Sequence, residues 1–419
     1  MRLVNTRSGH LEAFVEPPDH YAILSHRWTD EEVSFEEYEL ALHPPKYLLE
    51  REAAQVAIVK RRTGYTKIQD CCRVAAKHGF DWVWIDTCCI DKRSSAELSE
   101  AINSMWKWYE ESNMCYVYLA DVSPPARGRA LDYMGLERSS WFTRAWTLQE
   151  LLAPKKHRFY ASNWQHLFAL TRNMAFGGET SRHTFAANER SAEQMAAITS
   201  IPASVFLGNQ PDKRYSAAQR MSWAARRQAT RIEDVAYSLL GLFQINLPLL
   251  YGEGDRAFRR LQEEIIRQSD DETIFAWASS VPSPMEPRGL LAKSPLSFYD
   301  SADTEMYKAC QIRPAYTATN KGLAIRGPCR RLTREAQKPE DARLNPRLRG
   351  LLGGPFYHLE LNCLTPFADS DGRTDSRIGA LLLYQKFGNE TWGVLGLREW
   401  IQDLPEARDV EVRDFYVAL

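Results

Sequence analysis

The chain has 419 residues, of which 44% are hydrophobic and 26% charged, so it can form two or three folded cores with little disorder. Its formal net charge of −1 excludes the overall basic footprint of a nucleic-acid-binding protein. It opens without the apolar segment of a secretory signal, contains no run of roughly 18 apolar residues, and has too few cysteines for a disulfide framework, so we expect a cytoplasmic protein with no membrane span.

Short apolar segments alternate with helical patterns in the first 165 residues. The helical patterns begin near Thr66, after the capping sequence that starts at Ser94, and near Trp146. Strands that alternate with helices form parallel β-α-β units, so this region is predicted to contain an open, doubly wound parallel sheet. The predicted strands are 21–25, 81–86, 114–120 and 157–161.

The remaining sequence divides into two regions that differ in their predicted secondary structure. Residues 166–275 are predicted to be mostly helical, and residues 276–419 to form a β-rich domain. Residues 330–350 are rich in Arg, Lys and Pro without periodicity and predict an exposed loop. The predicted late strands are 273–278, 322–326, 356–363, 378–385, 391–397 and 410–418.

Polar residues follow the first two predicted strands directly. His26, Arg27 and Trp28 come after the first strand, and Asp86 ends the second. Ligands of doubly wound sheets bind beyond the carboxyl ends of the strands, so polar chemistry is expected at this edge. Asp121, which follows the third strand, is expected at the same edge.

Several segments together resemble the heterokaryon-incompatibility (HET) family of filamentous fungi. The resemblance extends to about residue 280, and Ala145 stands where the family usually has glycine. It implies a cytosolic α/β cell-death module in residues 1–165, followed by a helical extension in 166–275. The segments that carry it are Tyr21–Trp28, Tyr65–Ile68, Trp84–Lys92, Ala101–Met105 and Ser140–Glu150.

The HET domain in turn resembles the Toll/interleukin-receptor (TIR) fold. TIR enzymes that cleave NAD carry a glutamate four residues after a tryptophan, and Trp146, Glu150 and Leu151 stand at the same spacing. This remote resemblance implies a TIR/flavodoxin-like open parallel sheet. It also implies that NAD+ is a substrate rather than a cofactor, and that the protein forms a homo-oligomer on activation.

Glu150 is the candidate catalytic residue. On the resemblance it would stay ionised in the field of the helix start and stabilise the ribosyl cation that forms as nicotinamide leaves. The structural alternative is a first-turn glutamate that only favours the helix or pairs with Arg144. The adjacent pairs Cys71–Cys72 and Cys88–Cys89 lack the spacing of a zinc site, so no metal is expected.

The candidate substrate-binding residues comprise two arginines for a pyrophosphate, two tryptophans for ring stacking, and two further polar residues at the strand ends. Each has a structural alternative: tryptophans commonly pack in a core, His26 can be a satisfied structural histidine, and Asp86 can cap a turn. The residues are His26, Arg27, Trp28, Asp86, Arg144 and Trp146.

These features are compatible with three functions. The first is a cell-death effector of the incompatibility and innate-immunity type that hydrolyses NAD+. The second is a non-enzymatic death-signalling module that acts by self-association or partner binding. A nucleotide-binding regulator without turnover is a third. The β-rich domain at 276–419 is expected either to hold the HET domain inactive or to sense a protein partner.

Overall fold

The structure is a computed structural model that divides into two compact units. The first comprises Met1–Gln210 with Arg227–Leu250, and the second Pro211–Arg226 with Tyr251–Leu419. None of the described helices has both the length and the apolar character needed to cross a membrane. The residues that the structure describes are 1–44, 50–125, 133–174, 182–208, 214–277, 289–306, 315–320, 322–331, 356–368, 374–385, 391–394, 399–401 and 411–417.

A seven-stranded sheet organises the first unit, in the order β2-β1-β4-β3-β5-β6-β7. The pairs β3–β4, β3–β5 and β5–β6 are parallel, which confirms the predicted parallel strands. The whole sheet is mixed, because β1, β2 and β7 add antiparallel edges that the sequence patterns did not predict. The strands are β1 (Arg2–Asn5), β2 (Leu11–Ala13), β3 (Ala22–His26), β4 (Trp82–Trp84), β5 (Met114–Tyr118), β6 (Lys156–Tyr160) and β7 (His166–Thr171).

The hairpin of β1 and β2 depends on a tight polar turn. The side-chain oxygen of Asn5 accepts hydrogen bonds from the backbone N–H groups of Arg7 and Ser8 at 3.1 and 3.0 Å. Gly9 completes the turn with φ +77°, in the left-handed region where glycine is favoured. This turn folds β2 back onto β1, and β1 pairs with β4 on its other side.

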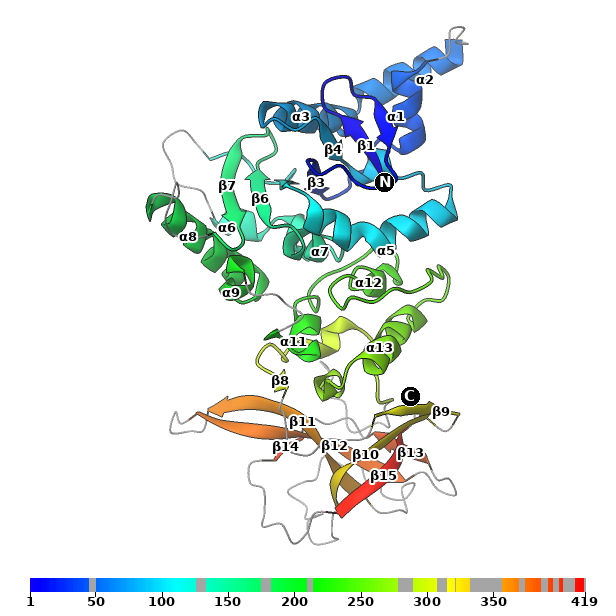
Figure 1. Cartoon of the computed structure of the whole chain (residues 1–419), viewed down its shortest axis with the longest axis vertical. Coiled ribbons are helices and arrows are strands. Elements are labelled where there is room, and N and C mark those ends of the chain that lie inside the picture. The colour runs from blue at the N-terminus through cyan, green and yellow to red at the C-terminus, as the bar shows by residue number, and fades with distance from the viewer. Residues whose placement is uncertain are drawn as a thin grey trace. The chain divides into compact units, whose positions relative to one another are not determined.

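Helices cover both faces of this sheet. Figure 1 shows α3 on one side of it and α5 and α7 on the other, as the winding of β-α-β units requires. The predicted Ser94 cap is present, since its hydroxyl accepts a hydrogen bond from the backbone N–H of Glu97 at 3.2 Å. The helices are α1 (Phe35–Leu42), α2 (Glu50–Arg61), α3 (Thr63–Lys77), α4 (Asp86–Cys89), α5 (Ser95–Glu111), α6 (Tyr133–Glu137), α7 (Thr147–Leu152), α8 (Arg182–Thr199), α9 (Ala203–Leu207) and α12 (Asp234–Tyr237), with a 3-10 turn η1 (Ser140–Thr143).

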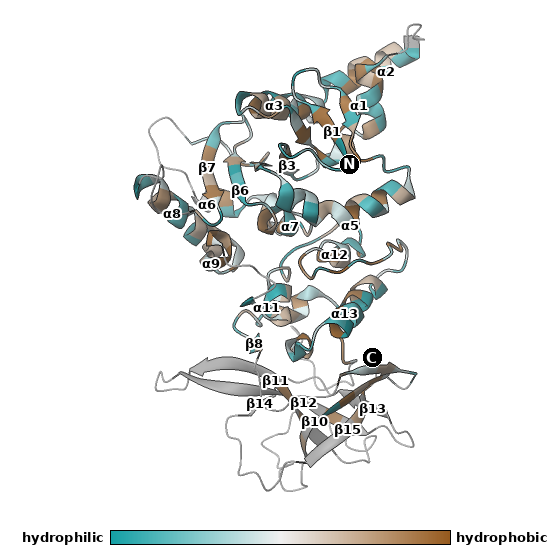
Figure 2. Cartoon of the chain, viewed as in Figure 1, coloured by the Kyte–Doolittle hydropathy of each residue, from teal (hydrophilic) through white to brown (hydrophobic). Residues whose placement is uncertain are grey.

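The core of the first unit lies between the sheet and these helices. Its largest fully buried side chains include Trp84, Trp141, Tyr109 and Phe159, so tryptophan serves mainly as core, as its usual role suggests. In Figure 2, β1 and β7 are largely brown, whereas α5 and α8 alternate between teal and brown. The helices are therefore amphipathic, with apolar residues such as Ile102 on the buried face of α5.

The second unit combines short helices with an eight-stranded sheet of order β14-β12-β13-β15-β10-β11-β8, with β9 paired to β10. The predicted β-rich region is thus confirmed, but the strand predicted at 273–278 is wrong, because a 3-10 helix capped by Asp271 occupies Glu272–Phe275. Residues 332–350 of the predicted loop lie outside the described residues. The elements are α11 (Ala217–Ser222), α13 (Arg256–Gln268), η2 (Glu272–Phe275), η3 (Pro295–Phe298), β8 (Glu305–Met306), β9 (Thr317–Thr319), β10 (Gly322–Arg331), β11 (Phe356–Ala368), β12 (Thr374–Gln385), β13 (Thr391–Val394), β14 (Glu399–Ile401) and β15 (Glu411–Val417).

Candidate active site

The direction of winding reverses at strand β3. The chain passes from β3 to β4 on one side, then returns across β3 to β5 on the other. Ligands of open α/β sheets bind at such a switch point, beyond the carboxyl ends of the strands. Ser25 and His26 are the last residues of β3, and Asp86 is the first residue of α4, just beyond β4. The fold therefore brings these polar residues to the position where a ligand is expected.

Glu150 lies in the first turn of α7 and is only 6% exposed. The hydroxyl of Ser25 donates a hydrogen bond of 2.5 Å to Glu150 Oε2, and Trp141 Nε1 donates one of 2.9 Å to Ser25 Oγ. A relay of two hydrogen bonds thus fixes the carboxyl group beneath the end of β3. The prediction that Glu150 lies near this edge is confirmed, but it is buried rather than at an open rim.

Burial decides the charge of Glu150. Removal from water raises its pKa from 4.5 to about 8, and the negative charge of Asp86 acts in the same direction. The hydrogen bond from Ser25 and the positive charge of Arg144 oppose this rise but are smaller. The expectation of an ionised Glu150 at neutral pH is therefore wrong for the protein by itself, because desolvation outweighs the favourable field at the start of the helix.

His26 is the centre of a buried polar cluster. Its side chain is 1% exposed, and its Nε2 atom lies 3.7 Å from both Glu32 Oε2 and Asp86 Oδ1, beyond hydrogen-bond distance. In the described part of the chain, both ring nitrogens and these two carboxylate oxygens lack a hydrogen-bond partner. Buried polar atoms almost always have partners, so this group indicates a place for water or for the polar group of a ligand.

Glu32 and Glu150 have opposite protonation states at neutral pH. Burial by itself would raise the pKa of Glu32, but its contacts with His26 and its ion pair with Lys67 outweigh burial and lower the pKa to about 2. Glu32 is therefore ionised while Glu150 keeps its proton. Titratable groups whose pKa values are pushed apart within one region are typical of acid–base chemistry.

Trp28 presents a partly exposed ring to cations. Its residue is 37% exposed, and its indole nitrogen donates a 2.7 Å hydrogen bond to Asp86 Oδ2. The ammonium nitrogen of Lys92 lies 3.3 Å from the ring centroid, and the guanidinium carbon of Arg144 lies 5.8 Å from it. Burial lowers the pKa of Lys92, with Asp86 opposing. The ring is thus a cation-binding face of the kind that π-systems provide.

A buried arginine stands behind Glu150. Arg227 is 9% exposed, and its guanidinium donates hydrogen bonds to the carbonyl of Arg144 at 3.0 Å and to the hydroxyl of Thr147 at 2.8 Å. Burial lowers the pKa of Arg227 to about 10, and the charge of Glu150 opposes this shift. Arg227 therefore fixes the start of α7 and leaves a positive charge in the neighbourhood of the carboxyl group.

The structure does not bring every candidate residue into this cluster. Arg27 is exposed, and Trp146 is half-buried at the N-cap of α7. No hydrogen bond, ion pair or ring contact joins either side chain to the cluster within the described ranges. Asp121, which follows β5, accepts hydrogen bonds from the hydroxyls of Ser139 and Ser140 at 2.7 and 2.6 Å. It therefore anchors the turn η1 rather than facing His26.

Four members of the cluster were not singled out from the sequence: Ser25, Glu32, Lys67 and Lys92. Ser25, Lys67 and Lys92 stand inside the family-like segments, but no local pattern assigns them a role. Lys67 lies on α3 and meets Glu32 across 35 residues. The sequence did contain a signal for Lys67, because it is a charged residue at a buried position of an otherwise apolar helix face. It is only 7% exposed in the structure.

The cysteines of the first unit are buried thiols. Cys88 is fully buried, and burial raises its pKa well above the ordinary value, so it carries no thiolate at neutral pH. Cys71 shows the same burial and the same direction of shift. Among the described residues, no group of three or more His, Cys, Asp or Glu side chains is placed to hold a metal ion.

Comparison with known proteins identifies similar sequences in both units. Residues 21–135 match the family described as heterokaryon incompatibility protein (HET), and residues 256–324 match a domain of unknown function, DUF8212. The chain is 40% identical over 256 residues to the vegetative incompatibility protein HET-E-1 of Podospora anserina, a match that covers 59% of this chain but 16% of that protein. No solved structure matches the chain. The chain is thus similar to heterokaryon incompatibility (HET) proteins, and the residues that match the HET family, 21–135, lie in the first unit.

Proposed function

We propose that this HET-domain protein is a cytoplasmic cell-death effector of vegetative incompatibility, and that its first unit hydrolyses NAD+ to nicotinamide and ADP-ribose. The observation that carries the proposal is Glu150, a buried carboxyl group with a pKa of about 8, beside Ser25 at the switch point of the sheet. Buried ionisable groups with such shifts concentrate at catalytic sites. The similarity to HET-E-1 supports the incompatibility role, although the chain spans only 16% of that protein.

The strand order supports a TIR/flavodoxin-like reading of the sheet. The four parallel strands run β4-β3-β5-β6, which in order of occurrence is 2-1-3-4. This is the order of flavodoxin-like sheets, in which the ligand lies at the end of the first strand. The corresponding position here is the end of β3, where Ser25 and His26 lie.

The reaction requires cleavage of one bond and addition of water. The bond between ribose C1′ and the nicotinamide nitrogen breaks, and its electron pair stays on that nitrogen, so neutral nicotinamide leaves. Ionised Glu150 stabilises the positive charge that develops on the ribose. Water then adds to C1′ and loses one proton to solution. The positive charge of the bound nicotinamide ring favours the ionised carboxyl, so binding supplies the charged form that burial alone disfavours.

Trp28 supplies a place for the nicotinamide ring. Its indole faces the ammonium of Lys92, and the positively charged nicotinamide ring would replace that ammonium on the ring face. As nicotinamide leaves it becomes neutral and loses the cation–π attraction. The orphaned oxygen of Asp86 and the His26 nitrogens are available for ribose hydroxyls or for the attacking water.

The decisive experiment compares nicotinamide release by the wild-type chain and by Glu150→Gln over a series of protein concentrations. Glutamine keeps the size of the protonated side chain, so the fold is retained. Loss of an electrostatic stabiliser costs on the order of a hundredfold in rate. The matched control is Glu36→Gln, an exposed carboxyl in α1 with a side-chain exposure of 65%. Equal rates for all three proteins would refute catalysis by Glu150.

The second candidate function is a non-enzymatic death-signalling module that acts through self-association or partner binding. The observation in its favour is that Glu150 already has a hydrogen-bond partner in the core, since its Oε2 atom accepts a hydrogen bond from Ser25. A purely structural carboxyl group would look the same. In that case Glu150→Gln induces cell death as the wild type does and leaves cellular NAD+ unchanged. The same substitution, measured in cells as death induction and loss of NAD+, therefore separates the two functions.

A further inference from the structure

A pocket lies away from the His26 cluster. It has a volume of about 640 Å³ and opens between the turn at residues 6–9, helix α1 and helix α3. This volume is within the range of small-molecule sites. Neither Glu150 nor any member of the His26 cluster lines it. The lining residues are Thr6, Arg7, Ser8, Gly9, Tyr38, Leu42, Tyr65, Gln69, Cys72, Arg73, Ala76 and Lys77.

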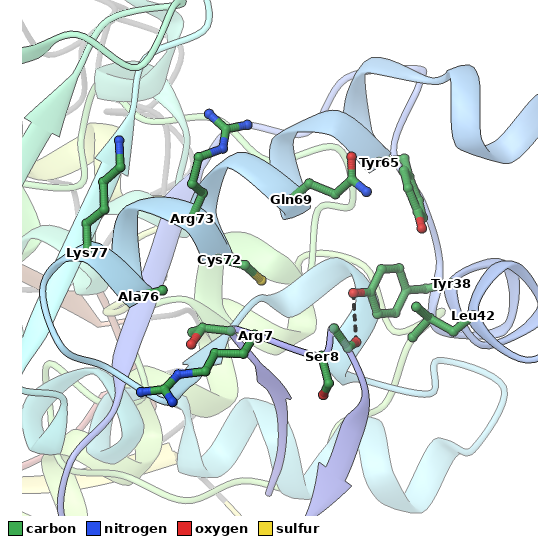
Figure 3. A pocket seen from close by; sticks show the side chains of 12 residues that line it. Arg7, Ser8, Tyr38, Leu42, Tyr65, Gln69, Cys72, Arg73, Ala76 and Lys77 are labelled. Atoms are coloured by element: carbon green, nitrogen blue, oxygen red, sulfur yellow. Dashed lines mark hydrogen bonds between the residues drawn. The ribbon is translucent and has the colours of Figure 1, made fainter.

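Cations gather at one end of this pocket. Figure 3 shows Arg7, Arg73 and Lys77 toward one end of the pocket and the tyrosine rings toward the other, with the charged ends of Arg73 and Lys77 above α3 in this view and that of Arg7 below it. Arg7 lies 3.2 Å from Asp81 and Arg73 pairs with Asp70, and both arginine side chains are largely exposed at 79% and 61%. Lys77 has no ion-pair partner in the described part of the chain. Exposed ion pairs are weak and open easily, so all three cations are available to an anion.

The floor of the pocket carries no opposing charge. Burial raises the pKa of Cys72 to about 12, and burial also raises the pKa values of Tyr38 and Tyr65. All three groups are therefore neutral at physiological pH. The rings of Tyr38 and Tyr65 lie 5.9 Å apart between centroids and form, with Leu42, an apolar end. The pocket thus joins a positive end to a neutral, partly aromatic one.

The walls of the pocket are held in place by the fold. The hydroxyl of Tyr38 donates a 2.9 Å hydrogen bond to the carbonyl of Gly9, which ties α1 to the N-terminal turn. The Asn5 side chain fixes the backbone at Arg7 and Ser8. A preformed pocket loses less conformational freedom on binding than a loop that must order, so it favours a specific ligand.

We propose that this pocket binds a small organic phosphate, with an aromatic body toward Tyr38 and Tyr65. The phosphate lies at the end that carries Arg7, Arg73 and Lys77, whose exposed side chains turn toward it on binding. Arginine meets phosphate through paired N–H donors, and lysine adds a point charge. A phosphate alone fills little of 640 Å³, so the organic body contributes part of the affinity. The proposal does not depend on NAD+ hydrolysis at Glu150.

Calorimetric titration of the full chain with adenosine 5′-monophosphate, inorganic phosphate and adenosine tests this site. The monophosphate is expected to bind saturably and more tightly than either fragment, with affinity that falls as salt increases. The double substitution Arg73→Glu/Lys77→Glu is expected to weaken binding by at least about tenfold. These side chains are exposed, so folding is retained, and Arg7→Glu serves as an independent variant.

Two control variants test whether the loss of affinity is specific to this pocket. Lys107→Glu changes an exposed lysine on α5, with 68% side-chain exposure, and is expected to leave the affinity unchanged. Glu150→Gln is also expected to bind the monophosphate normally, which separates this pocket from the proposed active site. The proposal is overturned if the monophosphate does not bind, if phosphate alone binds as tightly, or if the double variant keeps wild-type affinity.

Discussion

Replacing Glu150 by glutamine tests whether burial or the helix start controls this side chain. Burial raises its pKa to about 8, so the wild-type protein holds a neutral carboxyl group at pH 7. Glutamine is neutral at every pH and can accept the same hydrogen bond from Ser25. The substitution is therefore expected to be mild in acid and to become favourable, relative to the wild type, as pH rises.

The size of this effect follows from the pKa shift. Between pH 4.5 and 8 the unfolded chain loses the Glu150 proton while the folded chain keeps it, so the wild type becomes less stable as pH rises. A shift from 4.5 to about 8 corresponds to roughly 4 to 5 kcal/mol of unfolding free energy in total. About 3 to 4 kcal/mol of this falls between pH 5 and pH 8. The glutamine variant lacks this loss.

The effect is measured by urea unfolding at pH 5, 6, 7 and 8, with tryptophan fluorescence as the signal of unfolding. The stability of Glu150→Gln minus that of the wild type is expected to rise steadily across this series. Glu36→Gln, at an exposed position, provides the control and is expected to show a nearly constant difference. A glutamine variant whose difference from wild type is the same at pH 5 and pH 8 would show that Glu150 is ionised throughout, and the burial argument would fail.

Three further predictions concern the same domain. If ionised Glu150 acts on NAD+, kcat/KM for nicotinamide release rises with pH up to about 8 and then levels; a profile that is flat from pH 6 to 9 contradicts this. Ser25→Ala removes a hydrogen bond that lowers the pKa of Glu150, so the inflection moves to higher pH; an unmoved inflection counts against the relay. Gly64→Ala places a methyl carbon 2.4 Å from the backbone oxygen of Glu31, so we expect a loss of about 1 to 3 kcal/mol in urea unfolding, and unchanged stability would disprove the close contact.

Local patterns were enough to locate the parallel strands and several helices. The apolar run that ends at Ser25 predicts a buried strand in any tertiary setting, because such a run must leave water. The capping sequence at Ser94 likewise fixes the start of α5 through a contact of three residues. By contrast, the predicted strand at 273–278 is a 3-10 helix, since the Asp271 side chain caps a turn whose apolar residues are equally buried.

The state of the candidate active site was decided by contacts between residues far apart in the sequence. Glu150 meets Ser25 across 125 residues, and the charge of Asp86 reaches it from another strand end. Helix position alone favours an ionised carboxylate, but a pKa depends on the water and charges that surround a group. The sequence thus identified Glu150 and its element, whereas its burial, its protonation state and its hydrogen bond with Ser25 follow only from the order in which the strands pack.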